Sequence, residues 1–284
     1  MNKGNSSVHY KKTIKFSVLM SVYYKETSQN FNRAMQSIWD EQTVKPNEIV
    51  LIQDGKLTDE LYRVISEWKN KLSSVLKLIL LEENSGLASA LNEGVTRITN
   101  DYIVRMDTDD ISTPQRFEKQ LDFMNKNTDI DVCGTYIKEF GDTIEYSKVV
   151  TYPLTHNAML NFFKKRNPIA HPSAFFRRSF FEKSGLYEVN GHISNEDTLM
   201  WMRGFSSNCK FANVDFIGVE MQVGRDFFGR RGGFKKMTFD FKNRLTVNKR
   251  LHFGLVAYFY AIAVAIVNIM PATLKKIAYK YFRG

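Results

Sequence analysis

The sequence predicts an α/β fold in which a mainly parallel sheet is flanked by helices, with a basic, amphipathic helical tail at the end of the chain. Short apolar runs alternate with amphipathic segments between residues 16 and 106. The chain of 284 residues is 43% hydrophobic, which suits one large domain with a sizeable core. Residues 225–284 hold 13 Lys and Arg against Asp226 and Asp240, a balance of +11 within a net charge of +10. The rest of the chain is therefore nearly neutral, and the basic character belongs to the tail.

The first half of the chain has the pattern of strand–helix–strand units. Four short runs, β-branched or leucine-rich and bounded by polar residues, are predicted as buried strands: Phe16–Tyr23, Glu48–Gln53, Leu76–Leu81 and Tyr102–Met106. Apolar residues recur at helical spacing between them, in Asn30–Glu41, Thr58–Leu72 and Leu87–Thr99. This alternation predicts right-handed crossovers around a parallel sheet. In such open sheets ligands bind beyond the carboxyl ends of the strands.

The pattern changes after Asp110. We expect a helix from Pro114, because proline favours the first helical position. Further elements are expected, in chain order, as a strand at Asp131–Phe140, a helix at Asn157–Lys165, a strand at Ser173–Phe176, a helix at Asn195–Phe205 and an extended segment at Lys210–Val223.

The cysteines and the N-terminus bear on the compartment. Cys133 and Cys209 lie far apart without metal-type spacing, which favours a reducing compartment and does not support a zinc site. The segment Met1–Tyr10 is polar and carries no secretory signal. We therefore expect the protein on the cytoplasmic side.

Polar residues follow each of the four predicted strands. The first ends in SVYYKE at 21–26, the second in Asp54-Gly55, and the third leads to Glu83-Asn84-Ser85-Gly86. The fourth ends in RMDTDD at 105–110, which has three carboxylates within four residues. Because such carboxylates repel one another, a divalent cation relieves the cost of placing them together, and oxygen-rich sites of this type suit Mg²⁺ or Mn²⁺.

The ordered set of motifs resembles the family 2 glycosyltransferases, whose GT-A fold is Rossmann-like. The resemblance runs from Phe16 to about Gly233. RMDTDDIS at 105–112, followed by Pro-x-Arg-Phe, resembles the bacterial enzymes of capsule, exopolysaccharide and O-antigen synthesis. The motifs are MSVYYKE at 20–26, QDG at 53–55, ENSGLASALNEG at 83–94, RMDTDDISTPQRFEKQ at 105–120, HPSAFFRRS at 171–179 and NEDTLMW at 195–201. The resemblance implies a catalytic domain at 16–224, and composition and charge add a polar segment at 1–15 and a membrane-associating tail at 225–284.

The resemblance also implies roles for single residues. Val22, Tyr23 and Asp54 would contact the nucleobase, most often uracil, and Glu26 would lie near the ribose. Asp107 would face the ribose and the metal, and Asp109 would ligate Mn²⁺ or Mg²⁺ at the donor diphosphate. Asn84, Gly86 and Arg105 belong to the same donor site. Tyr24 stands where the family often has asparagine.

Two further motifs would complete the machinery. Glu196-Asp197 matches the family's acidic pair, and we assign the catalytic base to Asp197, with Glu196 next in line. One base opposite the leaving group predicts direct displacement with inversion. Arg225, Arg230 and Arg231 lie in a basic, glycine-rich stretch that would clamp the donor diphosphate, and the sequence does not distinguish between them.

The tail contains an uncharged run of 18 residues, Phe253–Met270, which ends at Pro271 and is followed by lysines and an arginine. A spanning helix wants about 20 apolar residues. We expect this segment to lie in the interface against anionic lipid, at the inner face of the plasma membrane, where a lipid-diphosphate-linked saccharide acceptor is met. A membrane span and an ordinary buried helix remain as alternatives.

Each motif also has a plain structural interpretation. Asp107–Asp110 could cap a helix, Asp54-Gly55 could be a simple turn, and His171 is more often a loop residue than a catalyst. Competing functions are a nucleotidyltransferase, and a membrane-bound, non-catalytic binder of nucleotide sugars or nucleic acid. The first lacks an early glycine-rich triphosphate loop, and the second does not need the ordered carboxylates. We therefore expect a UDP-sugar partner and no nucleic acid.

Overall fold

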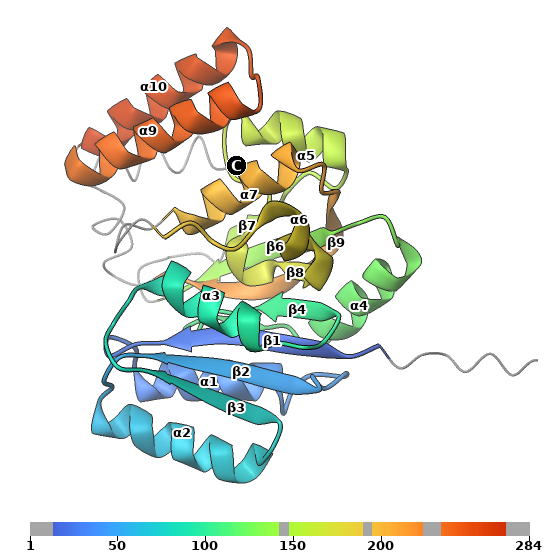
Figure 1. The fold of residues 1–284 in the computed structure, drawn as a ribbon, viewed down its shortest axis with the longest axis vertical. Coiled ribbons are helices and arrows are strands. Elements are labelled where there is room, and N and C mark those ends of the chain that lie inside the picture. Colours follow the sequence, from blue (N-terminus) through green and yellow to red (C-terminus); the bar gives the residue numbers. More distant parts are fainter. Residues whose placement is uncertain (1–13, 142–147, 190–194, 224–233, 271–284) are drawn as a thin grey trace, which may run out of the picture.

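The computed structural model describes residues 14–141, 148–189, 195–223 and 234–270, and the fold is drawn in Figure 1. Its centre is a nine-stranded sheet in which β7 (Lys148–Val150) pairs with β6 (Val132–Phe140). The remaining strands follow the order β3-β2-β1-β4-β8-β6-β9-β5. Their bounds are β1 Phe16–Val22, β2 Glu48–Asp54, β3 Leu76–Leu81, β4 Tyr102–Arg105, β5 Ile111–Ser112, β8 Phe175–Arg177 and β9 Phe211–Gln222.

Most of the strands run in one direction, as the sequence predicts. Strands β3, β2, β1 and β4 pair in parallel. Strand β8 is antiparallel to both β4 and β6, so β6 again runs with β4, and β9 is parallel to β6. Strands β5, β7 and β8 run the opposite way. The carboxyl ends of β1, β2, β3, β4, β6 and β9 therefore share one edge of the sheet.

The helices cover both faces of the sheet (Figure 1). Their bounds are α1 Ser28–Ile38, α2 Asp59–Leu72, α3 Leu87–Arg97, α4 Arg116–Lys126, α5 His156–Phe163, α6 Arg178–Ser184, α7 Glu196–Ser206, α9 Phe234–Arg250 and α10 Leu255–Ile269. Thr27 and Thr58 cap α1 and α2 by accepting hydrogen bonds from backbone N–H groups of the first turn.

Alternation along β1 divides the core into two layers. Val18, Met20 and Val22 point to the cluster under α1, α2 and α4, whereas Leu19 points to the cluster under α3, α6 and α7. Both clusters are rich in fully buried aromatic side chains, among them Phe31 and Phe117 in the first and Phe176, Trp201 and Phe211 in the second.

Several predicted boundaries shift in the structure, among them that of the first helix, predicted at Asn30–Glu41 and observed at Ser28–Ile38, and two of the shifts have a visible local reason. The helix expected from Pro114 begins at Arg116, since the Pro114 carbonyl accepts a hydrogen bond from Thr43 N at 2.9 Å outside the helix. The strand expected from Ser173 begins at Phe175, because His171–Ser173 form a 3₁₀ turn. The short elements β5, β7 and α6 have no counterpart in the sequence prediction.

The tail forms a helical hairpin, α9–α10, that packs on α7 (Figure 1). Val247, Phe253 and Ala257 of this hairpin join the core cluster of the sheet domain. No helix in the described part of the chain is long and apolar enough to cross a membrane.

Candidate active site

An acidic cluster lies just beyond the carboxyl end of β4, between β1 and β8. One carboxylate oxygen from each of Asp107, Asp109 and Asp110 lies within 4.8 Å of the others. At this position the sheet changes from parallel to antiparallel pairing on either side of β4. Ligands of open α/β sheets bind at such edges.

The cluster is held from several sides. Oδ1 of Asp110 accepts a hydrogen bond from Gln222 N at 2.8 Å, which links it to the end of β9. The Asp109 carbonyl accepts one from Arg33 of α1 at 3.1 Å. Asp107 forms an ion pair with Arg105, which is almost fully buried.

The carboxylates are electrostatically unsatisfied in the absence of a cation. Burial and the charges of Asp107 and Glu26 raise the pKa of Asp109 to about 7. Burial and the charges of Asp109 and Asp107 also raise the pKa of Asp110. Oδ2 of Asp110 is buried and has no hydrogen-bond partner among the described residues. Three hard oxygen donors, of which Asp109 and Asp110 carry unmet charge, fit Mg²⁺ or Mn²⁺.

Glu26 belongs to the same cluster. Its Oε2 accepts a hydrogen bond from Thr108 Oγ1 at 2.9 Å, and its charge raises the pKa of Asp109. The loop after β1 therefore reaches the end of β4, as the parallel pairing of these strands requires.

At the same edge of the sheet, Asp54 at the end of β2 organises the turn that precedes α3. Its Oδ1 accepts hydrogen bonds from Ser85 N at 2.7 Å and Ser85 Oγ at 3.1 Å. Its Oδ2 accepts them from Asn84 Nδ2 and Gly86 N, both at 3.1 Å. These four donors fill the acceptor positions of a carboxylate. A hydrogen-bond donor of the nucleobase would therefore have to displace one of them to bind Asp54.

Glycines permit this close approach. Gly55 has φ +82°, and a Cβ there would lie 2.7 Å from the Asn84 backbone nitrogen. Gly86, with φ +85°, precedes the first residue of α3. Both positions favour glycine because L-residues rarely adopt this conformation.

The two aromatic or apolar residues at the end of β1 behave differently. The Val22 side chain is fully buried in the core, so only its backbone is available to a nucleobase. Tyr23 is partly buried, with its ring centroid 5.7 Å from that of the exposed Tyr24.

The Glu196-Asp197 pair opens α7. Asp197 Oδ2 accepts a hydrogen bond of 2.8 Å from Asn167 Nδ2, and Oδ1 accepts one of 2.6 Å from Thr198 N. Oε1 of Glu196 lies 4.0 Å from His171 Nδ1. Burial and the charge of Asp197 raise the pKa of Glu196.

A buried network connects this pair to the acidic cluster. His171 Nε2 and the Tyr187 hydroxyl are 2.9 Å apart, and both side chains are buried. The charges of Glu196, Asp197 and Asp107 all raise the pKa of Tyr187. The charge of Arg105 lowers the pKa values of Tyr187, His171 and Glu196. Nε and Nη1 of Arg105 are buried and have no partner among the described residues. Arg105, the ion-pair partner of Asp107, is therefore close enough for its charge to influence His171, Tyr187 and Glu196, so the acidic cluster and the acidic pair are near each other.

Comparison with known families decides what this site belongs to. The sequence profile described as Glycosyl transferase family 2 matches residues 17–185, which is more than half of the chain. The chain belongs to glycosyl transferase family 2. It is therefore a glycosyltransferase, as the sequence predicts, and the two non-glycosyltransferase alternatives are set aside.

The relatives of this family 2 enzyme include two bacterial glycosyltransferases. It is 32% identical over 269 residues to the UDP-Gal:alpha-D-GlcNAc-diphosphoundecaprenol beta-1,3-galactosyltransferase of Escherichia coli, with 94% of this chain and 96% of that protein covered. It is 35% identical to the amylovoran biosynthesis glycosyltransferase AmsE of Erwinia amylovora, with 77% and 80% covered. The predicted relationship to glycosyltransferases of bacterial polysaccharide synthesis is confirmed.

The fold matches as well. A crystal structure of GalNAc-T7 with UDP, GalNAc and Mn²⁺ superposes with a TM-score of 0.63 at 18% identity, over 84% of this chain and 48% of that one. This likeness confirms the predicted GT-A fold of the glycosyltransferase.

Most of the predicted site residues of this glycosyltransferase lie along the one edge. Glu26, Arg105, Asp107, Asp109, Glu196 and Asp197 form the connected site, and Asp54, Asn84 and Gly86 form the neighbouring turn. Arg225, Arg230 and Arg231 lie outside the described residues. The individual roles given to these residues stay predictions.

The structure adds residues that the sequence analysis did not select. Arg116 is fully buried and donates hydrogen bonds to the carbonyls of Arg105 at 2.9 Å and Pro172 at 2.7 Å. It thereby joins the end of β4 to the His171 turn, and its place in the Pro-x-Arg-Phe motif was the available signal. Tyr187 and Asn167 carry no motif, and only the fold reveals them.

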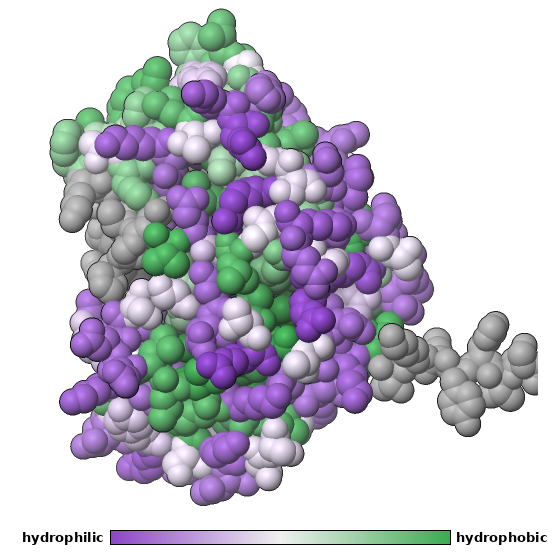
Figure 2. Space-filling view, in the orientation of Figure 1, coloured by the Kyte–Doolittle hydropathy of each residue, from purple (hydrophilic) through white to green (hydrophobic). Residues whose placement is uncertain are grey.

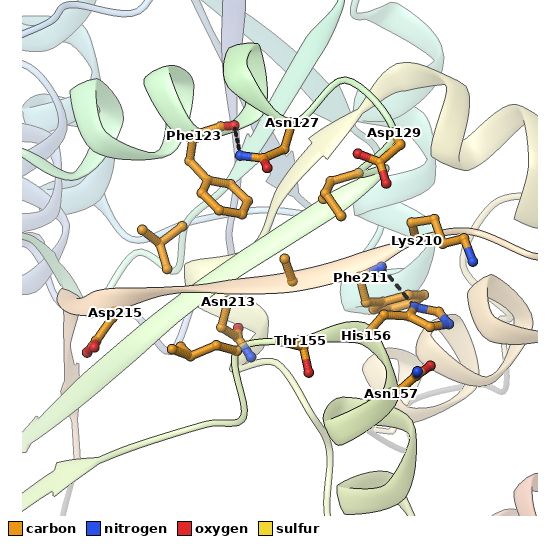
Figure 3. Close-up of a pocket in the computed structure, with 14 residues that line it drawn as sticks. Phe123, Asn127, Asp129, Thr155, His156, Asn157, Lys210, Phe211, Asn213 and Asp215 are labelled. Atoms are coloured by element: carbon orange, nitrogen blue, oxygen red, sulfur yellow. Dashed lines mark hydrogen bonds between the residues drawn. The ribbon is translucent and has the colours of Figure 1, made fainter.

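A pocket in the described part of the enzyme lies away from this site (Figure 3). This open cavity of about 630 Å³ is lined by residues of α4, α5 and the first residues of β9, with Phe211 N donating to His156 Nδ1 at 3.2 Å. Strand β9 begins there and reaches Asp110 only at its other end. The pocket is therefore separate from the carboxylates, and its chemistry is mainly that of apolar and neutral side chains.

Proposed function

We propose that this enzyme is an inverting hexosyltransferase that moves a sugar from a UDP-sugar to a lipid-diphosphate-linked saccharide in the synthesis of a bacterial surface polysaccharide. The observation that carries the proposal is the closeness of the acidic cluster to the Glu196-Asp197 pair. Arg116 donates hydrogen bonds to the carbonyl of Arg105, whose side chain pairs with Asp107, and to that of Pro172, which follows His171 beside Glu196. The names of the relatives supply the substrate classes, since they include a UDP-sugar, a diphosphate-linked acceptor and a polysaccharide.

The donor would lie along the carboxyl edge of the sheet. Tyr23 and the backbone of Val22 flank the position for the base, and the Asp54–Gly86 turn lies beside it. Asp109 and Asp107 would hold Mn²⁺ or Mg²⁺, with Asp110 in support. When bound, such a cation offsets the negative charge that develops on the leaving diphosphate.

Asp197 is the proposed general base. A carboxylate must take the proton of the acceptor hydroxyl as the new bond forms, because a neutral hydroxyl is a poor nucleophile. Asn167 and the Thr198 N–H fix the orientation of this carboxylate. Burial and the neighbouring charge disfavour the ionised form of Glu196, which supports Asp197 rather than Glu196 in this role. A single base predicts inversion, hence a β-linkage from an α-linked donor.

A lipid-linked acceptor would be met at the anionic, cytoplasmic face of the plasma membrane. Helix α10 exposes a set of large apolar side chains that would contact this face: Leu255, Val256, Phe259, Ile262, Ile266 and Ile269. Figure 2 shows apolar residues gathered over the α9–α10 hairpin. Exposed Lys249 and Arg250 at the end of α9 add positive charge. An apolar face with basic residues suits interfacial binding.

The test combines a donor screen with a base variant. Purified enzyme with Mn²⁺ or Mg²⁺ is offered a panel of UDP- and GDP-sugars, and thermal shift and transfer to a lipid-diphosphate saccharide are scored. Asp197→Asn should keep UDP binding and lose about 10²–10⁴-fold in kcat. Asp122→Asn, on the exposed face of α4, is the control. Near-normal transfer by a folded Asp197→Asn enzyme would move the base to Glu196.

A further inference from the structure

A cluster of cations lies between the proposed base and the α9–α10 hairpin. Lys164, Lys165 and Arg166 directly follow α5, and Arg244 reaches them from α9. Nη1 of Arg244 donates a hydrogen bond to the Phe163 carbonyl at 2.9 Å, and its guanidinium lies 5.6 Å from the centroid of the Phe163 ring. The charge of Asp197 raises the pKa of Arg244, and the charge of Arg166 lowers it.

The cluster adjoins the base on one side. Asn167, the next residue after Arg166, donates the hydrogen bond of 2.8 Å to Asp197. Adjacent Cα atoms are about 3.8 Å apart, so the backbone of Arg166 lies immediately beside the residue that holds the base.

The cluster adjoins the apolar hairpin on the other side. Nζ of Lys165 lies 4.9 Å from the centroid of the Tyr260 ring of α10, and Nζ of Lys164 lies 5.7 Å from that of Phe253. A hollow of about 370 Å³ between α5 and the α9–α10 turn is lined by Lys164, Leu160, Leu251 and Phe253. Phe259 and Val256, exposed on α10, continue the apolar surface.

The cluster gathers positive charge around Arg244. Among the described residues, the charges of Asp197 and Asp240 raise the pKa of Arg244, and the charge of Arg166 lowers it. Asp240 also accepts a hydrogen bond from the Asn195 side chain. A diphosphate diester carries two negative charges, and guanidinium groups bind such oxygens in bidentate fashion.

The order of these features matches the order of groups in one kind of molecule. A saccharide linked through diphosphate to a lipid presents a hydroxyl, then the diphosphate, then the chain. The enzyme presents Asp197, then the cations, then an apolar helix. We propose that Lys165, Arg166 and Arg244 form the subsite for the acceptor diphosphate; this inference rests on the proposed lipid-linked acceptor.

The test measures binding without turnover. Undecyl diphosphate and undecyl monophosphate are titrated by calorimetry into enzyme saturated with UDP and Mn²⁺, so that the donor site is filled. The wild type should prefer the diphosphate, and Arg166→Gln should weaken its binding about tenfold or more, because one charge-assisted contact is lost. Lys126→Gln, an exposed lysine of α4, should bind like the wild type.

Further variants guard against a folding defect. Arg244→Lys keeps the charge and should retain more diphosphate affinity than Arg244→Gln. Lys165→Gln removes an exposed cation and should leave the melting temperature unchanged. In steady state, Arg166→Gln should raise the acceptor KM, with UDP affinity unaltered.

The outcomes separate this subsite from the proposed function. If the wild type does not prefer the diphosphate, or Arg166→Gln and Arg244→Gln bind it as tightly as the wild type, the subsite is wrong even though transfer persists. If the variants lose diphosphate binding but the wild type glycosylates no lipid-diphosphate saccharide, the subsite stands and the proposed acceptor is wrong.

Discussion

The side-chain amide of Asn167 donates a hydrogen bond of 2.8 Å to Oδ2 of Asp197, although the two residues are 30 positions apart in the chain. Thr198 Oγ1 donates in turn to Oδ1 of Asn167 at 3.0 Å, which fixes the amide in this orientation. The proposed base is therefore aligned by a neutral group from a loop outside the family's acidic motif.

Removal of this amide should impair turnover. Asn167→Ala loses a hydrogen bond to a charged group, worth about 1.5–3 kcal/mol, so we expect kcat to fall by about tenfold or more. UDP affinity should stay unchanged, because Asn167 does not contact the acidic cluster. Steady-state kinetics and a UDP titration check both points, with Asn70→Ala on the exposed face of α2 as the control. An unchanged kcat would show that the hydrogen bond does not align the base.

The acidic cluster should make the cation-free protein less stable as the pH rises. Folding raises the pKa of Asp109 to about 7, above the ordinary value of about 3.9, so the folded state favours the protonated carboxyl. The contribution of Asp109 to stability should therefore be most favourable near pH 4 and decline as the pH rises towards 7, with little further loss from this group above that.

Melting curves recorded with a chelator across this pH range test the effect. Asp109→Asn should flatten the dependence, and Glu26→Gln, which removes a neighbouring negative charge, should weaken it. Mn²⁺ should raise the melting temperature more near pH 8 than near pH 5.5, because protons and the cation compete for the same carboxylates. Equal stabilisation at both pH values would argue against this cluster as the cation site.

Asp54 should be important for stability as well as for donor binding. In Asp54→Asn one oxygen becomes an amide that cannot accept hydrogen bonds from Ser85 or Gly86 N–H groups. Leaving such donors unpaired costs about 1–3 kcal/mol each, and we expect a loss of this order in the free energy of unfolding measured with urea. Asp122→Asn, which breaks only an exposed ion pair, should cost under about 1 kcal/mol. Weak UDP binding at full stability would instead indicate a direct contact with the base.

The exposed face of α10 should bind membranes. Phe259→Asp and Val256→Asp place charges on side chains that are 71% and 62% exposed, so folding should be unaffected. Both should reduce sedimentation with vesicles that contain anionic lipid, because a charge disfavours burial of this face among the acyl chains. Val149→Asp, an exposed apolar position on β7, is the matched control. If all three variants sediment like the wild type, another surface contacts the lipid.

The sequence predicts the first half of the fold well because local signals there agree with the tertiary structure. The runs that form β1 to β4 are short and apolar, and Thr27 and Thr58 mark the starts of α1 and α2. The elements β5 and β7 are two and three residues long, too short for periodicity to reveal them. They exist because β9 and β6 offer edges with which they pair.

The sequence by itself determined the family, the fold class and the identity of the acidic residues, since those signals are local: Asp107, Asp109 and Asp110 are neighbours in the chain, as are Glu196 and Asp197. Tertiary structure alone decided which distant residues complete them. Arg116 and Tyr187 act at the site because parallel pairing of β1 with β4 and antiparallel pairing of β4 with β8 gather their segments at one sheet edge. The charge of Asp197 influences Arg244 only because α9 packs on α7. Such contacts depend on long-range packing, and a single sequence contains no local pattern that specifies it.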